Sequence, residues 1–507
     1  MITHTFSKLH ALRQFSLVTL FSLTSSTAWA LDNPLWEKAT TKVGPDAAVP
    51  GWYLNLGISG ARAMITKGAP TQLKVMFIFK DSPADGKLAV GDKITGVNQQ
   101  PFVTAHKFGY GMGKFGYQGP IMDFGNALET SQGTLGGKLV IDVLRGEQKL
   151  QVELQLPTRF GALAATYPYD CKKSDLLLKE SCEWLLKAQQ ADGMWGDRPD
   201  TNACATLALL GSGDSAYLPA VKKAVTQMAA TTGGDANSGL PTWEYTLYGT
   251  TLAEYYLITR EAWVLKELKE IDVWLSKAQQ GKIIAPETAH IAGGFGHGFY
   301  TKGANGYGGM NITTAQAMTT WGLMARCGLK MNQQRLTAAH DFIAKGTNAI
   351  GYVWYADDVG GDGYADMGRT GASAVAHFVN AAGNPDYLAF AKLNAVCIGE
   401  HPDTFIDTHA SPLLGMAWTA LGAATDPVSF RKLMDQNRWA ISMSQCSDGS
   451  FYYQPNRDNN PQDYTAGPRL AATAVTALIL SIKENKLQIT GASPVTVTTA
   501  VETPKSE

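Results

Sequence analysis

The chain has 507 residues, and its 43 lysines and arginines nearly balance its 44 aspartates and glutamates, which gives a formal net charge of −1. This length predicts about two to four domains. A hydrophobic share of 45% provides enough apolar surface for a large core, which excludes wholesale disorder. Because a nucleic-acid binder needs a basic surface to neutralise phosphates, we expect no nucleic-acid partner.

Residues 1–30 have the order of a secretory signal peptide. Lys8 and Arg13 precede an apolar run at residues 15–23, and Ala28-Trp29-Ala30 fits a small-x-small cleavage site. A membrane anchor is the alternative, but the apolar run is short for a bilayer. We therefore expect an exported protein, periplasmic or extracellular, with no membrane span after cleavage. A linker would follow over residues 31–51.

Residues 52–157 predict a small domain of β-strands with one helix. Apolar and alternating runs between turn residues predict the strands, at residues 73–79, 94–98, 139–144 and 150–156. The last two runs flank Arg145-Gly146-Glu147, which is a hairpin signal. Residues 123–131 predict the helix.

This segment resembles a PDZ domain in Ser82-Pro83-Ala84, in the block at residues 88–98 and in the closing hairpin. The resemblance implies a loop whose backbone N–H groups hold the carboxylate of a bound peptide or protein, formed by Leu54, Asn55, Leu56 and Gly57. The ligand would add as a strand beside that loop. The alternative is a PDZ-like fold that serves only for packing.

Residues 165–487 predict an array of helical hairpins. Residues 184–190 recur as residues 274–280, and the spacing Gln-x₃-Gly-x-aromatic occurs at residues 189–195 and again at residues 445–451. Helical patterns begin near residues 174, 201, 216, 242, 262, 311, 332, 368, 385, 408, 428 and 466. Alternate patterns are rich in small residues, as a closely packed inner ring requires, while the others carry charge on one face.

These patterns predict a multidomain protein: a small β-rich (α+β) domain followed by an all-α (α/α)₆ toroid of six helical hairpins. A linear solenoid is the alternative, but it needs polar caps. In the Gln-x₃-Gly-x-aromatic element, glycine would end the outer helix and the aromatic ring would fill the gap between hairpins. Glutamine would satisfy free backbone groups there. Ligand stacking by the aromatic ring is the other interpretation. Residues 492–507 predict a disordered tail.

The repeats resemble the aromatic-glutamine motifs of terpenoid cyclases and of the related prenyltransferase toroid. The mature chain as a whole resembles an uncharacterised bacterial secreted family in which a PDZ-like segment precedes such a toroid. The stretches that carry this resemblance lie at residues 306–311, 366–371, 408–412, 448–451 and 486–491. The resemblance brings no established activity with it.

Loops that feed the inner helices of a toroid meet at one mouth, where convergent polar and aromatic groups are typical of a ligand pocket. We predict three catalytic residues there, Asp366, His409 and Glu244. We predict a second set that binds substrate, formed by Asn311, Arg369, His297, Tyr307, Trp243 and Tyr364. His409 has the alternative of a capping or buried histidine.

A divalent cation at Asp358, Asp362 and Asp366 is a weak alternative to a site without metal. Those carboxylates would otherwise cap the helix that begins near Gly368, with Asp366 and Arg369 as an ion pair. A zinc set of Cys397, His401, Asp407 and His409 matches no standard spacing. We therefore predict no cofactor and no metal site.

Two functions remain from the sequence. The first is an exported enzyme that acts on a polymer, a polysaccharide or a cell-wall component, in the toroid cavity, where aromatic rings stack on sugars and carboxylates do acid–base work. The second is a non-catalytic envelope scaffold that docks a partner through the PDZ-like edge and the toroid surface.

Overall fold

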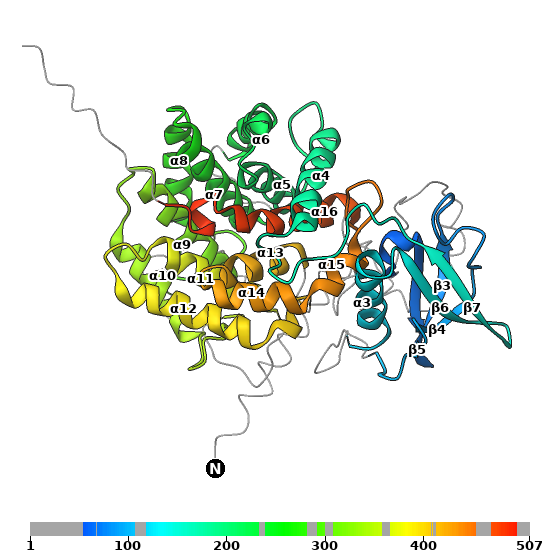
Figure 1. Ribbon diagram of the computed structural model, residues 1–507. Coiled ribbons are helices and arrows are strands. Elements are labelled where there is room, and N and C mark those ends of the chain that lie inside the picture. Colours follow the sequence, from blue (N-terminus) through cyan, green and yellow to red (C-terminus); the bar gives the residue numbers. More distant parts are fainter. Residues whose placement is uncertain are drawn as a thin grey trace, which may run out of the picture.

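The computed structural model describes residues 54–66, 68–106, 118–232, 239–280, 292–299, 308–356, 366–406, 408, 412–452 and 468–493. These residues form a sheet domain that lies beside a ring of helices (Figure 1). The predicted signal peptide, the linker and all but the start of the predicted tail lie outside the described residues.

The sheet domain contains one antiparallel sheet in the order β1-β2-β3-β4-β6-β7, with β5 paired to β4. Its strands are β1 (Leu54–Asn55), β2 (Ala61–Thr66), β3 (Ala69–Ile78), β4 (Lys93–Val97), β5 (Gln100–Pro101), β6 (Lys138–Arg145) and β7 (Gln148–Gln155). Helix α3 (Pro120–Gly133) packs on β3, β4 and β6, with Phe124 and Leu128 fully buried. The predicted hairpin forms β6 and β7, and Gly146 in their turn has a φ of 60°.

Helices alternate between an outer and an inner ring. The outer helices are α4 (Lys172–Ala188), α6 (Leu218–Thr231), α8 (Val264–Ala278), α10 (Gln333–Lys345), α12 (Pro385–Glu400) and α14 (Pro427–Gln436). The inner helices are α5 (Pro199–Gly211), α7 (Pro241–Thr259), α9 (Asn311–Arg326), α11 (Gly368–Val379), α13 (Pro412–Ala423) and α16 (Pro468–Ser481). Each begins within four residues of its predicted start. One short helix, α15 (Arg438–Ser444), was not predicted.

The inner helices form a closed cycle, since each contacts the next in chain order and α16 returns to contact α5. Their faces are lined by small residues that allow close approach. Between α11 and α13, an added Cβ on Gly368 would lie 2.6 Å from the Cα of Gly415, and Gly371 lies directly against Gly422. The all-α ring predicted from the small-residue helices is therefore closed, and the linear alternative is wrong.

One turn recurs around the outside of this ring. Gly193, Gly293, Gly351 and Gly449 have φ values of 93°, 93°, 90° and 86°. Each lies against the backbone or Cβ of the following outer helix, so that a larger residue would collide with it. These contacts reach α6, α10, α12 and finally α4, the first outer helix. The last glycine thus joins the end of the array to its beginning.

Glutamine and aromatic side chains complete this turn as the repeat predicts. Gln189 Nε2 donates to the carbonyls of Gly193 and Ala220 at 2.8 Å each, and Gln279 Nε2 makes the same pair of bonds in the next repeat but one. Trp195 is fully buried, and its Nε1 donates to the Leu185 carbonyl at 2.7 Å. The structural interpretation is confirmed for the glutamine and the aromatic ring. The prediction that glycine ends the outer helix is wrong, because α4 ends at Ala188 and α8 at Ala278, and Gly193 and Gly293 lie in the turns that follow.

The C-terminal segment closes one end of the ring. The backbone N–H groups of Gln488 and Ile489, in the 3₁₀ turn η7 (Gln488–Thr490), donate to the carboxylate of Glu254 at 2.9 Å each. Burial raises the pKa of Glu254 to about 7, against the effect of these two bonds. Arg326 NH1 donates to Gln488 Oε1 at 2.7 Å. This segment covers the C-terminal ends of α7 and α9, so we expect any mouth of the ring at the N-terminal ends of the inner helices.

Helix α15 fastens the sheet domain to the ring (Figure 1). It packs on α3, on β1 and on the 3₁₀ turn η1 (Gly57–Ser59). Glu129 of α3 accepts from Ser442 Oγ of α15 at 2.7 Å and pairs with Lys173 Nζ of α4 at 2.5 Å. The Lys173 side chain is fully buried, and burial lowers its pKa. The two bodies therefore share a desolvated ion pair, which is costly to break.

The predicted peptide loop lies under this junction, which differs from the open loop that we expected. Leu54, Asn55 and Leu56 are buried, with at most 6% exposure, and Gly57 lies against the Ser442 carbonyl. Arg62, which follows the loop, lies between the rings of Phe79 and Tyr452, at 4.4 and 4.2 Å from their centroids. The reason is α15 of the ring, which packs on β1 and η1 and so covers the predicted loop.

Among the described residues, no helix is long and apolar enough to span a bilayer.

The ring contact can be tested at Gly449. We expect Gly449→Ala to lower the free energy of unfolding by about 2–4 kcal/mol, because a left-handed alanine is strained and its Cβ would lie 2.8 Å from that of Glu180. Gly383→Ala is a matched control, with a φ of 74° and nothing within 4 Å of the added Cβ. It should lose only about 1–2 kcal/mol. Equal losses in urea denaturation would contradict the contact.

Candidate functional site

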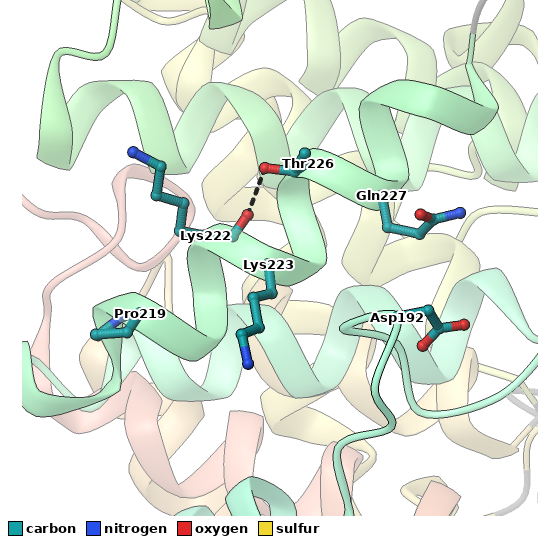
Figure 2. Close-up of a pocket in the computed structure, with 6 residues that line it drawn as sticks. All are labelled: Asp192, Pro219, Lys222, Lys223, Thr226 and Gln227. Carbon is teal, nitrogen blue, oxygen red and sulfur yellow. Dashed lines mark hydrogen bonds between the residues drawn. The ribbon is translucent and has the colours of Figure 1, made fainter.

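A hollow of about 470 Å³ lies on the outer ring (Figure 2). It is lined by Asp192, Pro219, Lys222, Lys223, Thr226 and Gln227, which belong to α6 and to the turn after α4. Lys222 already pairs with Glu261 at 2.9 Å, and the Thr226 hydroxyl donates to its own helix. This hollow contains none of the predicted site residues.

Two of the predicted substrate-binding residues, Trp243 and His297, contact each other at the N-terminal end of α7. Trp243 lies in the first turn of α7, and its Nε1 donates to His297 Nδ1 at 2.9 Å. The backbone N–H of Thr242 donates to the His297 carbonyl at 3.0 Å, which fixes the loop before α9 to the start of α7. Burial lowers the pKa of His297, in keeping with a neutral ring whose Nδ1 accepts. Both side chains are half-buried.

Glu244 follows Trp243 in α7. Among the predicted site residues that the structure describes, it is the acid whose pKa is shifted by its surroundings. Burial raises its pKa, although a hydrogen bond with Thr231 acts in the opposite direction. No cation pairs with Glu244 in the described part of the chain. A half-buried carboxyl group that holds its proton longer than usual can donate it to a substrate.

A second carboxylate, Asp200 of α5, lies in the same region. Arg198 binds it through both oxygens, at 3.0 and 2.6 Å. Burial raises the pKa of Tyr248, and the charges of Glu244 and Asp200 add to that effect. Asn202 Nδ2 donates to the Tyr248 hydroxyl at 3.4 Å. Two acids with unequal surroundings thus lie near one tyrosine, where α5 meets α7.

Asp366 and Arg369 contact each other, which is the ion-pair alternative. Their side chains are 3.0 Å apart and less than one-tenth exposed. Arg369 also donates to the Val353 carbonyl at 3.3 Å and to the Tyr352 hydroxyl at 3.1 Å. The pair therefore ties the preceding turn to the start of α11. The catalytic role of Asp366 and the substrate-binding role of Arg369 stay predictions.

Asn311 has a similar bracketing role. Its Nδ2 donates to the Trp354 carbonyl at 2.9 Å and to the Ala356 carbonyl. Its Oδ1 is buried and has no partner among the described residues. Other buried polar atoms near the same ends of α5, α7 and α9 share that condition: Thr201 Oγ1, Thr242 Oγ1 and Gln316 Nε2. Because buried polar atoms are nearly always satisfied, these positions call for water or a polar ligand.

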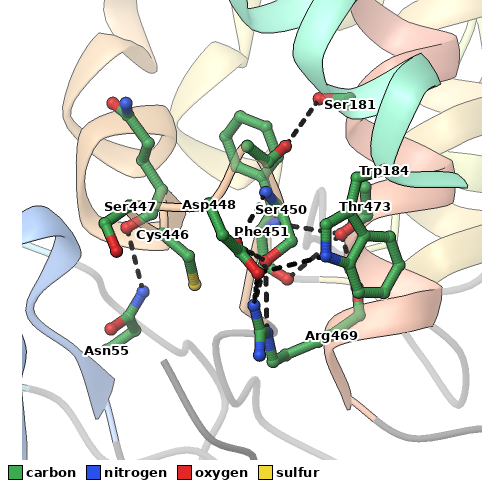
Figure 3. A network of polar contacts seen from close by, with 12 residues as sticks. Asn55, Ser181, Trp184, Cys446, Ser447, Asp448, Ser450, Phe451, Arg469 and Thr473 are labelled. Atoms are coloured by element: carbon green, nitrogen blue, oxygen red, sulfur yellow. Dashed lines mark hydrogen bonds and ion pairs between the residues drawn. The ribbon is translucent and has the colours of Figure 1, made fainter. Parts of the chain in front are cut away.

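A polar network that we did not predict joins the last repeat to the first (Figure 3). Asp448 accepts from Trp184 Nε1 at 3.1 Å and from Arg469, while the Ser450 hydroxyl donates to Asp448 at 2.6 Å. Burial opposes the charge on Asp448, but Arg469 and Ser450 hold its pKa below the usual value. The repeat spacing around Gly449 indicated a turn at Asp448, but it could not indicate that Trp184 of the first repeat lies beside that turn.

The remaining predicted site residues lie outside the described residues. These are His409, Tyr307, Tyr364, Asp358 and Asp362. Within the described ranges, no group of three or more histidine, cysteine or acidic side chains could hold a metal ion.

Residues 174–491 match DUF6288, a domain of unknown function. The chain belongs to this family. The DUF6288 match covers the helical ring and not the sheet domain. No curated protein matches the sequence.

Several solved structures are similar to the DUF6288 chain. A GH76 α-mannanase from Bacteroides thetaiotaomicron is 13% identical with a TM-score of 0.44, over 61% of this chain and 95% of its own. A GH76A α-1,6-mannanase from Salegentibacter sp. HEL1_6 is 13% identical with a TM-score of 0.44, over 61% and 98%. The type II terpene cyclase MstE from Scytonema is 13% identical with a TM-score of 0.42, over 62% and 99%.

The surroundings of Glu244 give a pH-dependent prediction. Since the folded-state pKa is raised, the folded chain favours the protonated acid, and this stabilisation is lost as the pH rises through the raised value. We therefore expect Glu244→Gln to unfold at the same temperature as the native chain near pH 4 and at a higher temperature near pH 8. Glu147→Gln, on the exposed hairpin turn, should show no such difference. A destabilised Glu244→Gln at pH 8 would contradict the burial argument.

Proposed function

We propose that this protein is an exported enzyme that hydrolyses a hydroxyl-rich polymer, a polysaccharide or cell-wall glycan, at the mouth of its ring. One observation carries the proposal: Glu244, whose pKa burial raises, follows Trp243, with its half-buried indole, in the first turn of α7. An indole face stacks on sugar rings, and a carboxyl group with a raised pKa protonates the leaving oxygen of a glycosidic bond.

The unsatisfied polar atoms of the inner helices support a ligand rich in hydroxyl groups. Thr242 Oγ1 and Gln316 Nε2 lie on α7 and α9, close in sequence to Glu244 and Asn311. Both side chains have no exposed surface, so a polymer cannot reach them directly, and enclosed water would satisfy these atoms. Such water can extend its hydrogen bonds to a sugar hydroxyl, which both donates and accepts, but not to an apolar substrate.

In the proposed reaction, Glu244 gives its proton to the bridging oxygen while the bond from the anomeric carbon to that oxygen breaks. Water adds to the carbon and loses a proton to a base. We assign the base to His409 on the sequence argument, because Asp366 is bound by Arg369. Trp243 would orient the sugar, with His297 holding the indole in place.

The scaffold alternative has less support at the sheet domain. The loop predicted to capture a peptide is buried under α15, and its Gly57 lies against the Ser442 carbonyl. We infer that this domain, PDZ-like by its sequence, packs against the ring and braces the seam between α4 and α15. Docking of a peptide there would first require the release of α15.

Reducing-end assays on mannan, heparin and peptidoglycan would test the proposal. We expect the native protein to release ends from at least one polymer, and Glu244→Gln to lose about 10²–10⁴-fold of that rate, as loss of a general acid does. Trp243→Ala should weaken polymer binding.

A matched control is Glu267→Gln on the outer helix α8, where burial also raises the carboxyl pKa. That variant should keep full activity. Native-like turnover by Glu244→Gln would refute the assignment, and binding without turnover by the native protein would favour the scaffold.

A further inference from the structure

Strand β7 forms an open edge of the sheet. It is the last strand in the sheet order and pairs only with β6 in the described part of the chain. Figure 1 shows the β6–β7 hairpin on the side of the sheet domain away from the ring. The residues exposed along it are Gln148, Lys149, Gln151, Glu153 and Gln155. An edge of eight residues offers a row of backbone donors and acceptors to another strand.

The register decides which backbone groups face outward. β6 and β7 pair without a shift from Arg145 opposite Gln148 to Lys138 opposite Gln155. A two-residue turn closes with a hydrogen bond between its flanking residues, so Gln148 bonds inward to Arg145. Because bonding direction alternates along an antiparallel strand, Lys149, Gln151 and Glu153 present their N–H and C=O groups outward.

Two of the usual protections of an edge strand, proline and a β-bulge, are missing from β7, although Lys149 and Glu153 give it charge. Leu150 and Val152 lie opposite Val143 and Ile141, on the buried face of the sheet, yet they are themselves only half-buried. Helix α3 contacts β3, β4 and β6 and so leaves the apolar side chains of the edge strand partly uncovered.

The charges along β7 are self-complementary in one register. When two copies of the strand run antiparallel with Gln151 opposite Gln151, Lys149 lies opposite Glu153 of the second copy, and this pair occurs twice. Leu150 then lies opposite Val152 on the apolar face. The backbone N–H and C=O groups of Lys149, Gln151 and Glu153 all point away from β6. In this register, each of these residues therefore exchanges two backbone hydrogen bonds with the residue opposite it in the second copy.

Slipped registers lose this agreement. A slip by one residue places side chains of opposite faces together and sets Leu150 against Glu153. The bond of Glu153 to Lys138 within one chain, 2.6 Å long, does not prevent the intermolecular pair, because both side chains are more than half exposed and such pairs are weak.

We propose that β7 is a dimer interface, at which a second copy of this chain adds antiparallel about Gln151 to make one continuous sheet. The inference does not depend on the proposed enzymatic function. In this dimer, the sheet edge at β7, opposite the edge at β1 on which α15 packs, serves self-association.

Sedimentation velocity across a range of protein concentrations tests this dimer. We expect the native chain to associate and both Lys149→Glu and Glu153→Lys to raise the dissociation constant about tenfold or more, since each homodimer then sets like charges together twice. An equimolar mixture of the two variants places opposite charges at both pairs again. It should recover association to within about threefold of the native value.

Gln151→Pro provides an independent check, because it removes the outward N–H at the centre of the interface and no backbone bond to β6. It also removes the bond from Gln151 Nε2 to Asp142 Oδ1, so Gln151→Ala, which loses only that side-chain bond, is the matched control and should associate as the native chain does. Gln151→Pro should prevent association while far-ultraviolet circular dichroism and the unfolding temperature stay near native. A native chain that is monomeric at every concentration would overturn the proposal. So would charge variants that associate as the native chain does, or a mixture that stays monomeric.

Discussion

The ring depends on glycines at four of its turns, where the backbone packs directly against the next outer helix. At Gly193, Gly351 and Gly449 the left-handed backbone brings the turn within contact of a helix, where a side chain has no room. The contact at Gly449 is the decisive one, since α4 is the first outer helix of the array. Because it closes the ring, the starts of the inner helices face one region, and residues distant in sequence can act on one substrate.

The sheet domain reinforces this closure. The ion pair of Glu129 and Lys173 joins α3 to α4, and Ser442 joins the same carboxylate to α15. The three elements that meet at the seam are therefore held through one buried acid. The sheet domain therefore packs against the ring through the β1 edge, α3 and η1, while its far edge at β7 stays exposed.

Local patterns predicted most of the ring, because helical periodicity, glycine turns and small-residue faces are properties of short segments. Helix α15 was not predicted because it has only seven residues. Its apolar residues Trp439 and Met443 pack against Gly125 of the sheet domain, a contact that the local sequence does not reveal. The Asp366–Arg369 ion pair was foreseen as an alternative because its members lie three residues apart. The Trp184–Asp448 bond joins residues 264 positions apart, and no local pattern specifies it.

The same limit applies to the candidate site. The sequence identified Trp243, Glu244 and His297 as mouth residues, because each lies in or before an inner helix. The sequence could not show which of these residues has an unusual pKa, because the pKa depends on burial and on whether the side chain has a charged partner. Glu244 stands out only when its surroundings are compared with those of Asp200 and Asp366, both of which are held by arginine.

Closure of the ring in solution is the claim on which the site rests, and zero-length carbodiimide coupling measures it most directly. Asp175 of α4 is exposed and forms an ion pair with Lys483, which follows α16. A closed ring predicts an amide bond between these two side chains, detected by mass spectrometry of the digested monomer. Coupling of Lys483 only to its neighbour Glu484, with Asp175 unlinked, would show an open array and remove the basis for a shared mouth.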